Sequence, residues 1–246
     1  MKLVADLHVH TVASGHAFST VMEIARAASL KGIEVVALTD HGPALPGGAH
    51  PYHFWNLRVV PRELEGVRLL RGIEANIIND DGEIDLAPEI LDSLDVVHAT
   101  FHNGCGYERG DQAKNTEVLI KAMDNPRVDF IAHPGSDYFP LDLEAVVEAA
   151  LNRGIAIELN NSSLLETTSR PGAKERDLEL AKLAARKGLP VVVSSDAHIA
   201  TDVGNFVAAV ELAELASIPE ELVLNSSLEK VLDYLAERRK ARRWLP

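Results

Sequence analysis

The sequence contains little cysteine and no long apolar run. Cys105 is the one cysteine among 246 residues, which excludes a disulfide within the chain and fits a reducing compartment. No stretch approaches the roughly 18 consecutive apolar residues of a membrane-spanning helix. The residues before Asp6 do not form an apolar signal segment. We therefore expect a cytoplasmic protein without a membrane partner.

Positive charge is also scarce. The chain has 24 lysines and arginines against 37 aspartates and glutamates, which gives a formal net charge of −13. This balance argues against long nucleic acid as a partner, because such binding relies on basic side chains that neutralise phosphates. It does not exclude a small anionic substrate, since bound metal ions can dominate the local field. The basic stretch from Glu237 to Trp244 is typical of a solvated last helical turn.

What the sequence does contain is a repeated alternation of helix and strand patterns. Stretches that begin at Ala27, Ala149 and Ala184 each show an Ala-rich helix end, a glycine and a β-branched apolar run. Near-continuous apolar strands indicate a parallel sheet covered by helices. Seven strands are predicted, over 3–8, 34–39, 68–74, 95–101, 128–132, 156–159 and 191–195. Since no linker divides the chain, we expect one α/β domain over residues 1–246, either a barrel or a doubly wound sheet.

Local signals indicate where helices begin and where a loop is long. Thr20, followed three residues later by Glu23, predicts a capping box for the first helix. Asp142, Thr116 and Ser226 are candidate caps for later helices. The Pro- and Gly-rich segment over 43–61 is predicted to be a long loop that reaches over the active site.

Histidines gather at the ends of the predicted strands. His8 and His10 are two residues apart at the end of the first strand, so both side chains point to one face, as in a metal-chelating pair. Asp196 and His198 repeat this spacing after the last strand, and the remaining residues of this kind are His16, His41, Glu74, His102 and His133. In a barrel the carboxyl ends of the strands face one rim, where active sites are built. Seven imidazoles and two carboxylates together are hard to satisfy without cations and predict a site for two or three metal ions.

The motifs around these residues resemble those of the polymerase and histidinol phosphatase (PHP) family, most closely its YcdX-like metal-dependent phosphatases. The matching stretches are DLHVHTVASGHAFST, ALTDHGP, LLRGIEANI, DGEID, FH, IAHPG, ELNNSS and SSDAH, which span Asp6 to His198. The resemblance implies a single-domain, distorted seven-stranded (β/α)7 TIM-like barrel, in agreement with the number of predicted strands.

The resemblance also implies how the ligands divide among three divalent metal ions. The three implied sets are His8, His10, Glu74 and Asp196; Glu74, His102 and His133; and His16, His41 and His198. Glu74 would bridge the first two ions. Zinc is the metal that the family implies, and manganese or iron is compatible with the same nitrogen and oxygen ligands.

We interpret the chain as a phosphatase that hydrolyses phosphomonoesters. In this hypothesis two ions bridged by Glu74 share a water and lower its pKa, and the resulting hydroxide attacks phosphorus. The residues expected to act in catalysis through metal-bound water are Glu74, Asp196 and His198, and candidate substrate contacts are Arg58, Arg62, Asn161 and His53. The expected partner is a small phosphorylated substrate. The oligomeric state is left open, and a homo-oligomer is compatible with the sequence.

Three other functions stay open. An amidohydrolase also begins with an HxH pair on a barrel strand, but many of these enzymes carry a bridging lysine after the fourth strand, where this chain has His102. A phosphodiesterase or exonuclease acting on nucleotides or nucleic-acid ends is a closer alternative, because PHP proteins also perform this reaction. A non-catalytic metal-binding module is disfavoured by the intact ligand set.

Overall fold

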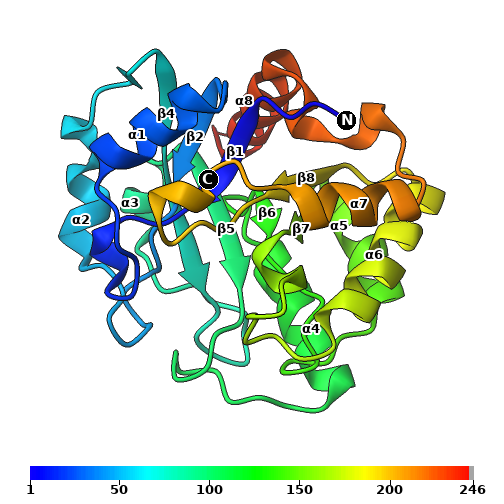
Figure 1. The fold of residues 1–246 in the computed structure, drawn as a ribbon. Helices are drawn as coiled ribbons and strands as arrows, with labels where there is room; N and C mark the ends of the chain where they lie inside the picture. The colour runs from blue at the N-terminus through cyan, green and yellow to red at the C-terminus, as the bar shows by residue number, and fades with distance from the viewer. Residues whose placement is uncertain (244–246) are drawn as a thin grey trace.

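The computed structural model describes residues 1–243, and these form a nearly closed barrel of seven parallel strands surrounded by helices (Figure 1). The barrel strands, in their order around the sheet, are β1 (Ala5–Val9), β2 (Val35–Leu38), β4 (Val67–Asn76), β5 (Val96–Thr100), β6 (Phe130–Ile131), β7 (Ala156–Asn160) and β8 (Val191–Ser194). A parallel bridge between Val9 and Ala197 joins the end of β1 to the segment after β8. The predicted distorted seven-stranded barrel is therefore confirmed.

Helices follow the strands and cover the outside of the barrel (Figure 1). They are α1 (Val21–Leu30), α2 (Pro51–Asn56), α3 (Pro88–Leu91), α4 (Gln112–Met123), α5 (Leu143–Arg153), α6 (Ala173–Lys187), α7 (Val207–Leu215) and α8 (Leu228–Arg243). Short 3₁₀ turns lie at Val12–Ser14, Leu57–Val59, Ser162–Leu164, Ala200–Asp202, Glu220–Leu222 and Leu224–Ser226. Within residues 1–243, no helix combines the length and the apolar character that a membrane crossing requires.

All seven predicted strands exist, with small shifts at their ends. One short strand, β3 (Glu63–Leu64), was not predicted and pairs antiparallel with the start of β4. Its two residues are partly exposed and carry no alternation that a sequence pattern could reveal. β3 belongs to the connection before β4 and lies outside the seven-strand barrel order.

Two of the four predicted helix caps are confirmed. Thr20 and Glu23 form the capping box of α1, and the side chain of Asp142 accepts a hydrogen bond at the start of α5. The prediction for Thr116 is wrong, because Asp111 caps α4 five residues earlier and Thr116 lies inside the helix.

The predicted cap at Ser226 is also wrong, by one residue. The Ser227 hydroxyl accepts a hydrogen bond from the Lys230 N–H (3.2 Å) at the start of α8. The Ser226 hydroxyl instead donates to the carbonyl of Val223 (2.8 Å). Adjacent serines offer the same capping chemistry, so the sequence does not choose between them.

The sequence predicted a long loop over 43–61, and the segment is instead partly helical. It contains α2 and the 3₁₀ turn Leu57–Val59. Pro51 occupies the first helical position and His50 accepts a hydrogen bond from the Tyr52 N–H, and proline at this position favours a helix start. Leu45 of this segment lines the central cavity described below, whereas α2 lies on the outside of the barrel (Figure 1).

Helix α8 closes the amino-terminal end of the barrel. Its Val231 and Leu235 pack into the apolar cluster that contains Phe130 of β6. The Arg238 guanidinium is 8% exposed and donates hydrogen bonds to the carbonyls of Val128 (2.5 Å) and Arg153 (2.7 Å).

The predicted solvated turn over residues 237–244 is therefore wrong at Arg238. It is also wrong at Arg239, whose guanidinium pairs with the buried Asp95 carboxylate just before β5. The last residue of the basic stretch, Trp244, lies outside the described residues. The stretch carries structural contacts because buried carbonyls and carboxylates need donors.

Candidate metal centre

The nine residues singled out by the sequence come together at the carboxyl ends of the strands. They lie on or just after β1, β2, β4, β5, β6 and β8, and they are His8, His10, His16, His41, Glu74, His102, His133, Asp196 and His198. Six of them are buried, His102 and His198 are partly exposed at 16% and 28% of their side-chain area, and His16 is exposed. Parallel strands bring these distant segments together because their carboxyl ends share one rim.

Four ligand atoms converge between β1, β4 and the segment after β8. Nε2 of His8 lies 3.1 Å from Nε2 of His10, and each of these nitrogens lies 3.5 Å from Oε2 of Glu74. Oδ1 of Asp196 lies 3.6 Å from the first nitrogen and 3.1 Å from the second. Two ligands at ~2.0–2.1 Å from one tetrahedral zinc ion lie about 3.3 Å apart. The four atoms are therefore spaced like the ligands of a single ion.

The second oxygen of Glu74 faces another pair of histidines. Oε1 lies 2.7 Å from Nε2 of His133 and 3.4 Å from Nε2 of His102. Glu74 thus directs Oε2 toward one group of nitrogens and Oε1 toward another. A bridging carboxylate between two ions has this arrangement.

A third group lies at the more open side of the cluster. Nε2 of His16 lies 3.2 Å from Nε2 of His41 and 3.0 Å from Nε2 of His198. His16 comes from the turn after β1, and His198 comes from the segment after β8. These two segments are joined by a hydrogen bond from the His10 N–H to the Ala197 carbonyl (2.9 Å).

The histidine rings are oriented by bonds at the nitrogen that points away from the cluster. Nδ1 of His8 donates to Glu158 (2.8 Å), and Nδ1 of His102 donates to Asn76 (2.7 Å). Further Nδ1 contacts join His10 to Ser14, His133 to Thr100 and His198 to the Asp196 carbonyl. A proton held on Nδ1 leaves the Nε2 lone pair free for a metal ion.

Several nitrogen and oxygen atoms of the cluster therefore face one another with no hydrogen bond between them. Nδ1 of His41 lies 2.6 Å from Oε2 of Glu74, yet both atoms are buried and lack a hydrogen-bond partner of suitable geometry among the described residues. Buried polar atoms without partners are costly. A cation placed among them removes this cost, so the donor set fits metal ions.

The electrostatics hold His10 and Glu74 in their metal-binding protonation states, whereas at His8 the fields of Glu158, Asp196 and Glu74 outweigh burial and raise the pKa well above its usual value. Burial, followed by the positive field of His41, lowers the pKa of His10 to about 3, so its imidazole is neutral near pH 7. Burial opposes ionisation of Glu74, but the fields of His41, His102 and His8 outweigh it and hold the pKa of this carboxyl well below its usual value. Metal ligation requires these neutral imidazoles and ionised carboxylates.

Two cluster residues have backbone conformations that residues other than glycine rarely adopt. His133 has a φ of +32° and Asp196 a φ of +55°. Such strain persists where the surrounding structure enforces it, and it is common at functional sites. At Asp196 the neighbouring Ser195 is held by the buried Asp6 carboxylate, which accepts from both the Ser195 N–H and its hydroxyl.

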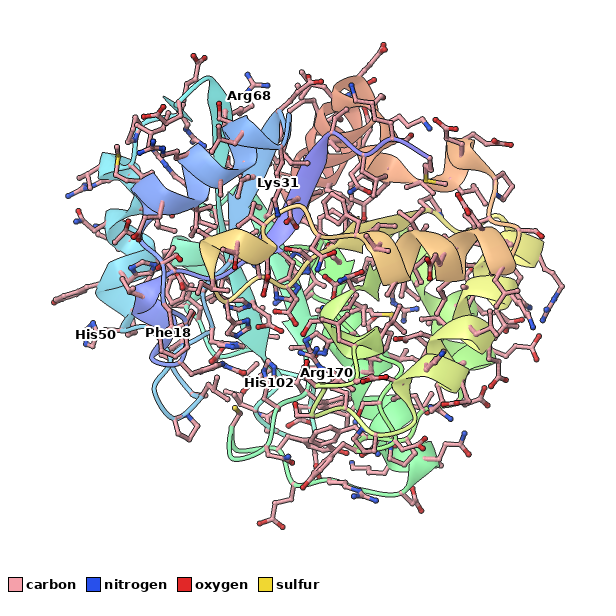
Figure 2. All side chains as sticks on the ribbon, in the orientation of Figure 1. Phe18, Lys31, His50, Arg68, His102 and Arg170 are labelled. Atoms are coloured by element: carbon pink, nitrogen blue, oxygen red, sulfur yellow. The ribbon has the colours of Figure 1, made fainter. Side chains whose placement is uncertain are left out.

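A cavity of about 480 Å³ opens beside the cluster. Its lining includes His16, His102, His133, Asp196 and Arg170. Figure 2 shows His102 and Arg170 beside each other, and His50 out at the edge of the molecule. Active and binding sites are usually cavities of this size with a few convergent polar groups.

Arg170 is the main functional candidate that sequence reasoning missed. Its Nη2 donates to Oδ2 of Asp196 (3.0 Å) and its Nη1 to the Ser163 hydroxyl (3.1 Å). Asn160 is the last residue of β7, and Arg170 follows it by 10 residues in the loop after the strand. Arg170 belongs to none of the motifs that predict the site. Glu158 was missed as a site residue too, although it is the first letter of the ELNNSS stretch.

The predicted substrate contacts do not lie in this cavity. Arg62 pairs with Asp95 beside α8, at the opposite end of the barrel, and the exposed Arg58 lies in the 3₁₀ turn after α2. Asn161 is buried and accepts a hydrogen bond from the Ala209 N–H of α7.

His53, the remaining predicted contact, lines a separate shallow hollow beside Trp55 and Val59. Its Nε2 lies 3.0 Å from Oδ2 of Asp40. Arginines and histidines on loops are too common on protein surfaces for their position to be predicted from composition alone.

Comparison with known proteins identifies the family. The PHP domain model matches residues 6–140, and the PHP-associated model matches residues 178–240. A probable phosphatase of Caldanaerobacter subterraneus subsp. tengcongensis is 50% identical over 98% of this chain and 94% of its own length. A probable phosphatase of Acetivibrio thermocellus is 48% identical over 98% of both chains.

A solved structure shares the fold at low sequence identity. The histidinol phosphate phosphatase of Lactococcus lactis, determined with zinc, L-histidinol and phosphate, has a TM-score of 0.64 and 17% identity, and the match covers 87% of this chain and 94% of that one. Together with the family models and the probable phosphatases, the fold and the converging histidines lead to one conclusion: the chain belongs to the PHP domain family.

Proposed function

We propose that this PHP-domain protein is a metal-dependent phosphatase that hydrolyses small phosphomonoesters at a site for three divalent metal ions, with zinc as the first candidate. The observation that carries the proposal is the convergence of Nε2 atoms on the two oxygens of Glu74, at spacings of 2.7–3.5 Å. The curated relatives named as probable phosphatases support the reaction class.

The three ligand sets correspond to the three groups of converging atoms. They are His8, His10, Glu74 and Asp196; Glu74, His102 and His133; and His16, His41 and His198. Ions bound there would activate a water and neutralise phosphate oxygens. Manganese or iron would suit the same nitrogen and oxygen ligands.

The residues of the chain hold this machinery in place. Glu74 divides its two oxygens between two ligand sets, and Asp196 offers Oδ1 to the cluster while Arg170 and Asn160 hold its Oδ2. His198 completes the third set at the edge of the cavity. Glu74, Asp196 and His198 therefore act in catalysis as the groups that fix the reacting water relative to the substrate.

Arg170 takes the role that the sequence analysis gave to Arg58 and Arg62. Its guanidinium is partly exposed and lines the cavity beside the cluster. A planar guanidinium with free donors suits a phosphate oxygen. Arg170 would bind the phosphate of the substrate and hold it against the ligand sets.

We extend the proposal to the chain as a whole: residues 1–246 act as one PHP-type hydrolase domain in the cytoplasm. Helix α8, near the carboxyl end of the chain, closes the barrel that begins with β1. Cys105 is the one cysteine and is buried, as expected in a reducing compartment.

The test is metal removal and restoration with two chromogenic substrates. The protein is treated with a chelator and then reconstituted with zinc or manganese, and hydrolysis of p-nitrophenyl phosphate and of bis(p-nitrophenyl) phosphate is measured. The proposal predicts monoester turnover that is lost with the metal and restored by it. A faster reaction with the diester would favour the phosphodiesterase alternative, and the absence of both reactions would contradict a phosphoesterase.

A further inference from the structure

The cavity beside the metal-ligand cluster has a wall rich in hydroxyl groups. The loops after β6 and β7 contribute six such side chains to its lining: Ser136, Tyr138, Ser162, Thr167, Thr168 and Ser169. None of them belongs to the three ligand sets. When the phosphate of a substrate is bound at the ligand sets, the alcohol portion of that substrate would therefore extend along this wall.

This wall offers no free negative charge. Asp196 is the sole carboxylate among the described residues that line the cavity, and both of its oxygens are engaged. Oδ1 contacts His10 (3.1 Å), and Oδ2 accepts from Asn160 (3.1 Å) and Arg170 (3.0 Å). An ammonium group brought into the cavity would lose water without gaining an anionic partner, which is unfavourable.

The hydroxyls are available for a neutral polar ligand. Among the residues whose side chains the structure describes, 1–240, no hydrogen bond to another protein group is made by the side chains of Ser162, Thr167 and Ser169. Each hydroxyl can both donate and accept, so it can pair with another hydroxyl in either direction. Tyr138 adds a half-exposed ring with the Arg109 guanidinium 5.6 Å from its centroid, and a ring face can pack against the C–H groups of a sugar.

We propose that the preferred substrate is a monophosphate of an uncharged, polyhydroxylated alcohol of about the size of a monosaccharide. The inference rests on the proposed phosphatase function and names the class of leaving group. The volume of about 480 Å³ lies at the small end of ligand cavities, which span roughly 300–1,000 Å³. Part of it is taken by the phosphate, so the remainder suits one ring.

A matched pair of substrates tests the proposal. Glucose 6-phosphate and glucosamine 6-phosphate differ only in whether C2 carries a hydroxyl or an ammonium, and kcat/KM for both is measured on the metal-loaded protein at a pH where the amine is charged. We expect kcat/KM to be at least about tenfold higher for the neutral sugar, because an unmatched polar group in a binding site is strongly rejected. p-Nitrophenyl phosphate, measured on the same sample, reports the hydrolytic reaction itself.

A charge introduced into the wall should reverse this preference. Thr167→Asp is compared with the neutral, equally sized Thr167→Asn, and the readout is the ratio of kcat/KM for the two hexose phosphates. The proposal predicts that the ratio shifts toward glucosamine 6-phosphate in the aspartate variant only.

The outcomes separate the two proposals. If p-nitrophenyl phosphate is hydrolysed but glucosamine 6-phosphate is used as well as or better than glucose 6-phosphate, the proposed substrate class is wrong and the phosphatase stands. Hydrolysis of a nucleoside monophosphate in preference to both hexose phosphates would also overturn it. No hydrolysis of p-nitrophenyl phosphate after metal loading would overturn the phosphatase and the substrate class together.

Discussion

Glu158 holds the face of His8 that points away from the cluster: its Oε1 lies 2.8 Å from Nδ1 of His8, while Nε2 of the same ring converges with His10. Both side chains are fully buried. The other oxygen of Glu158 accepts hydrogen bonds from the His133 N–H (3.0 Å) and from Asn160 (3.1 Å). One carboxylate thus fixes residues of two ligand sets.

Replacing Glu158 should therefore weaken metal binding without removing a ligand. In Glu158→Gln the side chain keeps its size, but His8 loses a charged acceptor that sets its tautomer and orientation. We expect metal affinity to fall about 10–100-fold, as for other groups that orient metal ligands. A competition titration against a chromophoric chelator measures this, with the exposed Glu166→Gln as the control. Equal affinities in the two variants would refute the role of Glu158.

Arg170 should affect substrate use more than metal content. Arg170→Met removes the donor to Oδ2 of Asp196 and the proposed contact with the phosphate. We expect kcat/KM for p-nitrophenyl phosphate to fall by about 10–100-fold, the range for a lost charged hydrogen bond, while most of the metal is retained. The control is Arg186→Met on the exposed face of α6. An unchanged kcat/KM in Arg170→Met would exclude Arg170 from the substrate site.

Asp177 makes the stability of the fold depend on pH. This side chain is buried, both of its oxygens lack a hydrogen-bond partner among the described residues, and burial raises its pKa to about 7 from an ordinary value of 3.8. The folded state then binds more protons than the unfolded state between these values, so the contribution of Asp177 is fully present below about pH 4 and is lost as the pH rises through 7.

Asp177→Asn should remove this dependence, because the amide is neutral at every pH. We expect the variant to be about 1–3 kcal/mol more stable than the parent at pH 8, with a smaller difference at pH 5. Chemical unfolding at the two pH values measures it. A difference that stays constant, or that grows toward low pH, would show that Asp177 does not titrate in this way.

Arg238 should be a stabilising residue of the closed barrel end. Arg238→Ala leaves the carbonyls of Val128 and Arg153 without their donor. We expect the free energy of unfolding to fall by about 2–4 kcal/mol, since a buried charged donor and its acceptors are lost together. The neighbouring Lys240→Ala, which loses only an exposed pair with Glu237, should change it by less than about 0.5 kcal/mol. Urea unfolding curves that coincide for the two variants would contradict this account of α8.

The sequence predicts the barrel and its ligand rim because both depend on local patterns. The apolar run of β8, Val191–Ser194, leads directly into Asp196 and His198. Since parallel strands place their carboxyl ends on one rim, the position of a histidine after a strand is enough to predict which side of the molecule it occupies.

Contacts between distant segments could not be predicted in the same way. Arg170 reaches Asp196 across 26 residues, and Arg239 reaches Asp95 across 144. Neither arginine lies next to a pattern that distinguishes it from exposed ones such as Arg186. The same limit applies to Arg62, whose partner in the fold is Asp95 rather than a substrate.

Helix starts show a second, smaller limit. Asp111 and Thr116 both have capping chemistry, but the Thr116 hydroxyl donates to the Gln112 carbonyl inside α4 (2.6 Å). A threonine can satisfy its hydroxyl within a helix in this way. Which of the two residues caps the helix depends on where the loop after β5 ends in space. The local sequence does not encode that position.

The central claim is that the converging side chains hold three metal ions, and elemental analysis of the purified protein by plasma mass spectrometry tests it most directly. We expect three transition-metal ions per chain after incubation with zinc, fewer in His10→Ala, and an unchanged number in His53→Ala, whose ring lies outside the cluster. Less than one ion per chain after incubation with zinc or manganese, or an unchanged metal content in His10→Ala, would contradict it.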